Sequence, residues 1–289
     1  MNAARRSMAW MIAFVALWAL VEALAAGLHR GYSPWQVVWT RYAVHLLAML
    51  AAFGWREPSS LWRTPRPGFQ LARSMCMVAM PAAAVFGLTR GGLDADTLMA
   101  GFWIAPLLIV ALAAAWLHER GTVVAWLACG VAFAGALLGL LHGLPAARAM
   151  AWPLAMASSF GAYVVMTRAL RVEPTRVNLF WTALGVFAVL SPFMPRVWIT
   201  PDLHDLALMV AVGVVGLGAL LALDRSAHAA PVSIAAPMAY LQWPLGLALA
   251  PGAGHSVTRP GSLAGLSLVG LAAAATWLRA PRLVVQDPA

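Results

Sequence analysis

Three ionisable side chains lie inside otherwise apolar stretches of this sequence: Glu22, Arg41 and His45. A charge surrounded by hydrocarbon is costly, so such groups pair with one another or face a water-filled cavity. With a rise of 1.5 Å per residue, Glu22 lies about 21 Å into its helix, and Arg41 reaches the same depth on the next, antiparallel helix. His45 follows Arg41 by one turn on the same face. Two readings stay open: a structural ion pair beside a packed histidine, or groups that bind a zwitterion or move a proton.

Aromatic and polar side chains in the same stretches offer contacts for a small, flat ligand. Eleven of the 14 tryptophans lie near the ends of apolar stretches or in loops, whereas Trp18, Trp103 and Trp243 lie deeper. An indole N–H finds no partner in lipid, so these rings face protein or a cavity in which a ligand can stack. Core packing is an equal alternative for each ring. The predicted ligand-contact residues are Trp18, Trp103, Ser158, Ser159, Tyr163, Tyr240, Gln242 and Trp243.

Four of the prolines within apolar stretches are candidate hinges, because each removes a backbone N–H and leaves the carbonyl four residues earlier without its helical partner. A kink satisfied by a hydroxyl or by water is the simpler reading for any one of them. Two of them recur at matching places in the two halves of the chain, which favours hinges. The predicted hinges are Pro81, Pro106, Pro237 and Pro244.

The composition indicates that most of this chain lies in a membrane. Hydrophobic residues make up 62% of the 289, charged residues make up 10%, and the mean hydropathy is +0.80. A helix of about 20 apolar residues spans the hydrocarbon core, and short loops leave no room for a soluble catalytic domain. The sequence predicts an all-α integral membrane protein of ten spans: 8–28, 35–53, 70–89, 95–117, 122–141, 150–169, 176–194, 206–224, 230–250 and 261–279.

The basic residues, all of them arginine, indicate orientation rather than nucleic-acid binding. The net charge is +9, but the arginines are scattered among loops instead of clustered on one surface. If ten helices alternate, 13 arginines fall on one side and five on the other, with Arg41 inside a span. The positive-inside rule then places both termini in the cytoplasm of a cell whose inner membrane holds the chain.

The sequence partly restarts at its middle. Met8, Ala9 and Trp10 are matched by Met150, Ala151 and Trp152, and the stretches 89–106 and 220–237 both end in an Ile-Ala motif before proline. We therefore divide the chain into two five-helix repeats, 1–149 and 150–289. Because five crossings are an odd number, the second repeat enters the membrane from the opposite face, as in many transporters. A duplicated scaffold without transport is the alternative.

Three phrases resemble the drug/metabolite transporter superfamily of the EamA type: "SPWQVVWTR" (33–41), "PLLIVALAAAWLHERGT" (106–122) and "SSFGAYVVMTRAL" (158–170). The resemblance covers essentially the whole chain, and among subfamilies it is strongest to the YddG-type aromatic amino-acid exporters. It implies a secondary transporter that exports small amphipathic metabolites by alternating access, through a cavity between helices 1, 3 and 4 and helices 6, 8 and 9. The implied partners are a small-molecule substrate and the lipid bilayer.

Other functions receive less support from the sequence. A membrane-embedded enzyme would need a nucleophile with its base or a metal cluster, but "HERGT" is not HExxH and "GLSLV" is not GxSxG. We expect no enzyme activity, no metal, no cofactor and no nucleic-acid partner. A flippase for lipids or lipid-linked metabolites is the main alternative, and a channel is less favoured. The sequence leaves the oligomeric state open, a monomer included.

Overall fold

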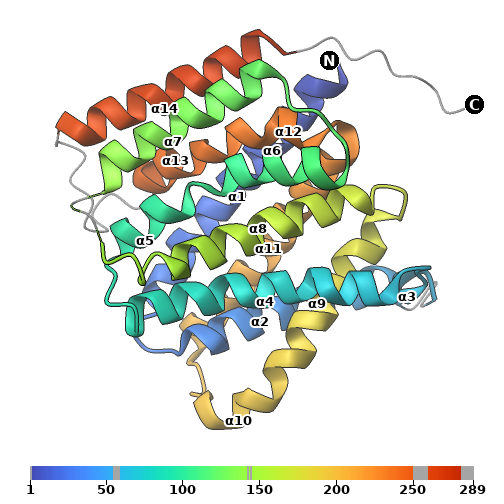
Figure 1. Ribbon diagram of the computed structural model, residues 1–289. Coiled ribbons are helices and arrows are strands. Elements are labelled where there is room, and N and C mark those ends of the chain that lie inside the picture. Colours follow the sequence, from blue (N-terminus) through green and yellow to red (C-terminus); the bar gives the residue numbers. More distant parts are fainter. Residues whose placement is uncertain (1, 55–58, 142, 144, 250–259, 281–289) are drawn as a thin grey trace, which may run out of the picture.

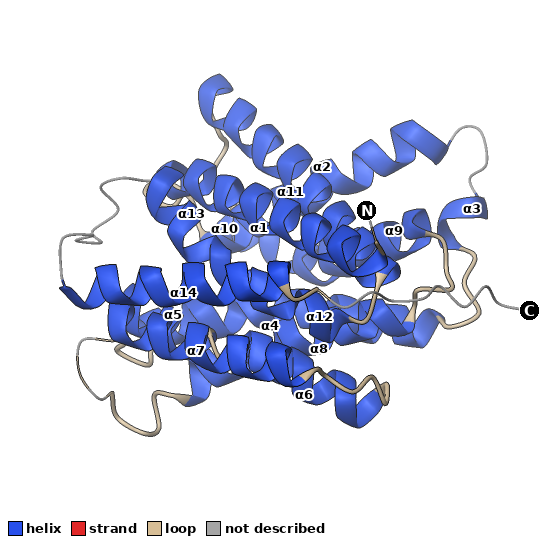
Figure 2. Cartoon of the chain, turned by 90° about the horizontal axis from the view of Figure 1, so that it is seen from above, coloured by secondary structure: helices blue, strands red, loops and turns tan. Residues whose placement is uncertain are grey.

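The computed structural model describes residues 2–54, 59–141, 143, 145–249 and 260–280. Within these residues every regular element is a helix (Figures 1 and 2). Nine segments of this part of the chain are long and apolar enough to cross a membrane, so the chain is a multi-span helical membrane protein. They are Ala3–Leu28, Pro34–Gly54, Pro67–Thr89, Ala95–Trp116, Val123–Leu140, Thr175–Val197, Leu203–Ala229, Val232–Leu249 and Gly261–Leu278.

The sixth predicted span, 150–169, coincides with helix α8 (Ala151–Ala169), but α8 is not one of these nine. The reason is its polar content, because Ser158, Ser159, Tyr163 and Arg168 lower its apolarity. The helix packs against α4 and α6. Its passage through the membrane therefore stays a prediction.

Two helices extend beyond the predicted spans. Helix α1 (Ala3–Leu28) begins five residues before the predicted start, because the Asn2 side chain accepts a hydrogen bond from the Arg5 backbone N–H at 2.9 Å. Helix α11 (Leu203–Ala229) continues past its predicted end at 224, which was wrong. Asp224 is buried within α11 instead of ending it.

Both predicted fourth helices are interrupted where the prolines occur. The span 95–117 divides into α5 (Ala95–Phe102) and α6 (Ala105–Trp116), and Pro106 lies in the first turn of α6. The span 230–250 divides into α12, a 3-10 helix that contains Pro237, and α13, in which Pro244 is the third residue; residue 250 lies outside the described residues. These three elements are α12 (Val232–Ala235), η3 (Ala236–Leu241) and α13 (Gln242–Leu249).

The remaining helices complete a bundle in which α1 packs against α11, α4 against α8, α2 against α9 and α11, and α7 against α14. The start of α1 and the end of α14 lie at the same end of this bundle (Figure 1). Pro81 lies inside α4. The elements not yet bounded are α2 (Pro34–Met49), η1 (Leu50–Gly54), α3 (Ser59–Trp62), α4 (Pro67–Thr89), α7 (Val123–Leu140), α9 (Thr175–Leu190), η2 (Ser191–Phe193), α10 (Met194–Val197) and α14 (Pro260–Leu278).

The Gly139→Ala variant is expected to be less stable than the wild type. The new methyl group on α7 would collide with the Trp243 ring, which also packs against Gly265 on α14 and has little room to shift. Overpacking of this kind costs about 1–3 kcal/mol. Thermal unfolding of the purified protein measures the loss. Gly130→Ala on the same helix is the control, since a Cβ there meets nothing within 4 Å, and an unchanged midpoint for Gly139→Ala would contradict the packing described.

Candidate functional site

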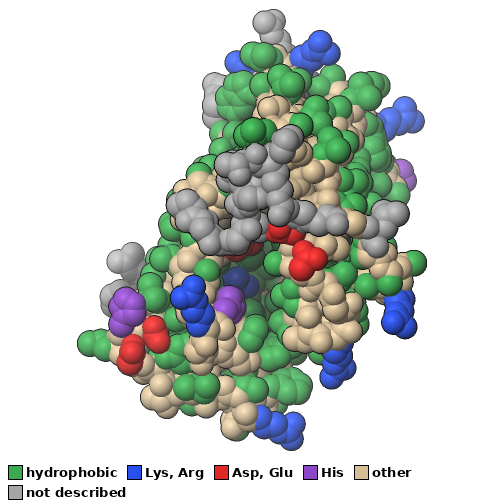
Figure 3. Space-filling model, turned by 90° about the vertical axis from the view of Figure 1, so that its left-hand side faces the viewer, with side chains coloured by type: hydrophobic (Ala, Val, Ile, Leu, Met, Phe, Trp, Pro, Cys, Tyr) green, Lys and Arg blue, Asp and Glu red, His purple; other side chains and the backbone are tan. Residues whose placement is uncertain are grey.

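Two adjoining cavities form a hollow inside the bundle. The larger, of about 490 Å³, lies between α1, α2 and α4, and the smaller, of about 270 Å³, lies between α1, α5 and α13. Glu22 and Ala26 line both cavities, so we treat them as compartments of one central hollow. Figure 3 shows a face of the molecule hollowed at its middle, with acidic, basic and histidine side chains around the opening. This face is the end of the bundle where α4 finishes and α5 begins, opposite the start of α1 (Figure 1).

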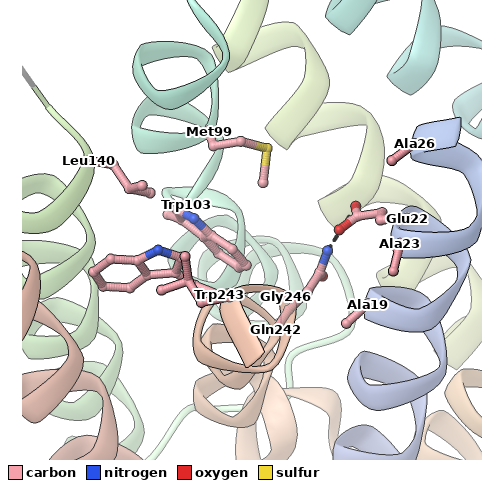
Figure 4. Close-up of a pocket in the computed structure, with 11 residues that line it drawn as sticks. Ala19, Glu22, Ala23, Ala26, Met99, Trp103, Leu140, Gln242, Trp243 and Gly246 are labelled. Carbon is pink, nitrogen blue, oxygen red and sulfur yellow. Dashed lines mark hydrogen bonds between the residues drawn. The ribbon is translucent and has the colours of Figure 1, made fainter. Parts of the chain in front are cut away.

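Glu22 lies where the two compartments meet. Its side chain is exposed to the hollow although helices surround it. The Oε1 atom accepts one hydrogen bond from the Trp18 indole N–H at 3.1 Å and another from the Gln242 amide at 3.0 Å. Figure 4 shows Gln242 reaching from α13 toward the carboxylate on α1. A carboxylate held by neutral donors keeps its charge available to a ligand.

Arg41 lines the larger compartment without reaching the Glu22 carboxylate. Its guanidinium lies over the Trp18 ring, 5.0 Å from the centroid, and over the Tyr42 ring at 4.8 Å. The ion pairs within the described residues are Arg168–Glu119 and His228–Asp224, so the direct Glu22–Arg41 pair that equal depth suggested is not formed. The physical reason is Trp18, whose N–H holds the acid while its face holds the base. Equal depth places two groups at one level but does not fix which way they point.

His45 lies outside both compartments. It is buried, it stacks on Tyr42 with ring centroids 6.1 Å apart, and its Nε2 has no hydrogen-bond partner. His29, at the end of α1, does line the larger compartment, and the sequence pattern did not select it. Burial and the nearby Arg41 lower its pKa below the usual value, so His29 adds no positive charge to the hollow at neutral pH.

Three of the predicted aromatic residues gather around the smaller compartment, while Trp18 lines the larger one. Trp103 and Trp243 line it, and Tyr240 packs on Trp103 with ring centroids 5.7 Å apart. Figure 4 shows the two indoles on the opposite side of this compartment from Glu22. The two indole N–H groups and the Tyr240 hydroxyl are buried without hydrogen-bond partners.

Other predicted site residues lie away from the hollow. Ser158 is exposed, Ser159 is half-buried, and neither lines a compartment. Tyr163 belongs to a polar network at the other end of the bundle. Of the predicted hinges, Pro81 alone lines the hollow, in its larger compartment, while the other three lie at the helix interruptions described above.

That polar network centres on Arg73, which the sequence pattern placed among the loop charges. Arg73 is buried in the second turn of α4. Its guanidinium donates to Gln70 Oε1 at 2.8 Å, to the Asn178 carbonyl at 2.6 Å and to the Thr167 hydroxyl at 3.1 Å. The network thereby ties α4 to α8 and α9.

The same network continues into α11 through two buried carboxylates. The Asn178 amide donates to Asp224 Oδ1 at 3.0 Å, and His228 lies 3.2 Å from the other oxygen of that carboxylate. The Gln70 amide donates to Glu173 Oε2 at 3.0 Å. We call Gln70, Arg73, Glu173, Asn178 and Asp224 the polar seal, because they close the end of the bundle opposite the hollow.

A signal for the polar seal was present in the sequence. Gln70 and Arg73 are three residues apart, and Asn178 and Thr182 are four apart, in predicted spans. Polar residues with this spacing share one helix face, and such a face inside a membrane must meet another polar face. Arg73 and Asp224 fall at the ends of the predicted spans 70–89 and 206–224, and Arg73 was counted with the loop charges, which hid the pattern.

Arg73→Met is expected to destabilise the protein severely. The change leaves Gln70 Oε1 and the Asn178 carbonyl without the arginine that bonds them, and breaking a buried charged network in this way costs about 3–5 kcal/mol. Thermal unfolding of the purified protein measures the loss. Arg171→Gln, an exposed arginine at the same end of the bundle, is the control. Equal midpoints for the two variants would mean that the polar seal contributes little.

Comparison with known proteins supports transport in general terms. No protein-family model matches the chain. A protein named S-adenosylmethionine uptake transporter from Rickettsia bellii is 24% identical over 182 residues, which span 62% of this chain and 62% of that transporter. A solved crystal structure, described only as that of a protein, aligns with a TM-score of 0.78 at 21% identity, covering 95% of this chain and 98% of the other. The multi-span helical fold and the named relative fit a transporter family.

Proposed function

We propose that this protein is a secondary transporter of the EamA type that exports small zwitterionic metabolites, amino acids with aromatic side chains among them, by alternating access. The observation that carries the proposal is the placement of Glu22 and Arg41 in one hollow without a direct ion pair. An ammonium group can approach the acid and a carboxylate the base, while Trp18 between them offers its ring. A direct ion pair between Glu22 and Arg41 would have neutralised both groups and left neither charge for a substrate.

The packing of the helices supports two repeats of five. Helix α1 packs on α11 and α8 packs on α4, so the first helix of each proposed repeat meets the third helix of the other. Likewise α2 packs on α11 and α9 on α4, while α2 meets α9 and α7 meets α14. Exchanging the halves leaves these pairings unchanged, which is what a pseudo-two-fold axis requires.

Residues 142 positions apart behave alike, at the same offset that aligns Met8 with Met150. Thr40 and Thr182 each donate to the carbonyl four residues earlier, that of Gln36 and that of Asn178. Both of those amide side chains are fully buried. These equivalences support the repeat independently of the opening phrase.

The asymmetry of the bundle supports alternating access between two such repeats. At the open end, the second half of α4 stands away from α1 and α2 across the larger compartment. At the sealed end, the equivalent part of α11 is held to α9 by Asp224 and to α8 by Arg168, which donates to the Ala227 carbonyl at 2.8 Å. We infer that the opposite state opens between α11 and α8–α9, with Pro106 and Pro237 as hinges.

The test of function is counterflow in proteoliposomes preloaded with an unlabelled amino acid. We expect saturable, trans-stimulated exchange of labelled phenylalanine, and a loss of about 10-fold or more in Glu22→Gln. The variant keeps an oxygen for Trp18 and Gln242 but lacks the charge for the substrate ammonium, and a hydrogen bond to a charged group contributes about 1.5–3 kcal/mol.

Glu119→Gln is the matched control, since that carboxylate pairs with Arg168 outside the hollow and its loss should leave phenylalanine affinity unchanged. If Glu22→Gln transports normally and only unfolds at lower temperature, Glu22 is structural. Linear, unsaturable flux would indicate a channel, and movement of a labelled lipid would favour the flippase alternative.

S-adenosylmethionine is a second candidate substrate, supported by the named relative and by the chemistry of the hollow. This molecule joins an amino-acid zwitterion to a sulfonium cation and an adenine ring, groups that Glu22, Arg41 and the tryptophans can each receive. The same counterflow assay with labelled S-adenosylmethionine inside or outside the vesicles separates the two substrates and measures the direction.

Asp224→Ala is expected to shift the protein toward the state that opens at the sealed end. The change removes the α9–α11 bond of the polar seal, and the loss of one charged hydrogen bond shifts an equilibrium by about 10- to 100-fold. The measurement is the labelling rate of a cysteine introduced at the buried Thr182, with Cys76 and Cys129 replaced by alanine. Asp205→Ala, at the other end of α11, is the control. Equal labelling in both variants would contradict the proposed gate.

A further inference from the structure

A third cavity, of about 440 Å³, lies outside the hollow, on the other face of α4. Its walls are Val78, Ala82 and Phe86 on α4 and the segment from the end of α9 through α10. We call it the lateral crevice. It has the size of a ligand pocket, and its lining is apolar apart from Arg196.

Helix α4 separates the lateral crevice from the hollow. Its residues alternate between the two spaces: Met77 and Val85 face the hollow, whereas Val78 and Phe86 face the crevice. Trp35 and Phe86, with ring centroids 6.3 Å apart, stand at the boundary. The charged groups of the hollow, Glu22 and Arg41, therefore do not line the crevice.

Positive charge gathers at the same end of the crevice as its aromatic wall. Arg196 is exposed and lines the crevice. The guanidinium of Arg90, at the end of α4, lies 5.0 Å from the centroid of the Phe86 ring. Arg90 follows the end of α4, and Arg196 lies in the last turn of the membrane-crossing segment Thr175–Val197, so both arginines lie at the level of lipid headgroups.

We propose that the lateral crevice binds an anionic phospholipid, with an acyl chain between α4 and α9 and the headgroup phosphate on Arg196 and Arg90. Charge complementarity selects this occupant. A zwitterionic lipid presents the same phosphate but adds a cationic group that the two arginines repel, and a neutral chain gains nothing from them. The bound chain lies directly behind the part of α4 that borders the hollow, so it supports α4 in the position seen here. This site is independent of which substrate the hollow carries.

Native mass spectrometry of the detergent-solubilised full chain, titrated with dioleoylphosphatidylglycerol or with dioleoylphosphatidylcholine, tests the proposal. We expect tighter binding of the anionic lipid. Arg196→Gln should lower its affinity about five-fold, the factor for one arginine at a membrane surface, while Arg171→Gln at the other end of the bundle should leave it unchanged.

Ala82→Phe should fill the crevice and weaken the binding of both lipids, whereas Ala134→Phe, on the exposed face of α7, should not. Arg196 is exposed, so its variant is expected to fold even where a core substitution fails. Equal affinity of the wild-type protein for the two lipids, or an unchanged affinity of the anionic lipid for Arg196→Gln, overturns the proposal.

Discussion

A carboxylate inside a bundle of apolar helices must be met by a cation, by water or by hydrogen-bond donors, and the structure around Glu22 follows from that constraint. Two neutral donors, Trp18 and Gln242, come from α1 and α13, which belong to opposite ends of the sequence. They hold the carboxylate without neutralising it. Because the nearest base is turned onto the face of Trp18, the hollow keeps an acid and a base that are both exposed to a ligand.

The charged side chains at the two ends of the bundle differ in burial and in hydrogen bonding. At the polar seal, Arg73 and Asp224 are buried and bonded to side chains from several helices. In the hollow, the charged groups line empty volume. A buried charged network is strong only while every partner is in place, so it behaves as a contact that is either made or broken. That behaviour suits a gate, whereas partly exposed charges suit a binding site.

The membrane-spanning helices were predictable because a run of about 20 apolar residues between short polar loops matches the thickness of a bilayer and is rare in soluble domains. The contacts of Glu22 were less predictable. Helix depth brought Glu22 and Arg41 to one level, but the rotation of each helix, which packing decides, turned the base toward Trp18. Ser158 was chosen for its chemistry and lies on an exposed face, since a hydroxyl in a helix can bond its own backbone and needs no cavity. The polar seal was missed because Arg73 and Asp224 fell at the ends of the predicted spans, whereas α4 and α11 extend further and bury both residues.

The two proposed repeats contribute unequally to the hollow, because the ionisable side chains come from the first repeat alone. At the offset of 142, Glu22 corresponds to Val164, Arg41 to Ala183 and His45 to Phe187. Residues that shape helix packing have counterparts of the same type in the other repeat, as Thr40 and Thr182 do. The ionisable residues at or near the hollow have none. Two equivalent scaffolds can exchange conformations at little cost, because helix packing that opens at one end of the bundle forms again at the other. In the proposed mechanism, a single acid and a single base give that motion one binding site, which faces each side of the membrane in turn.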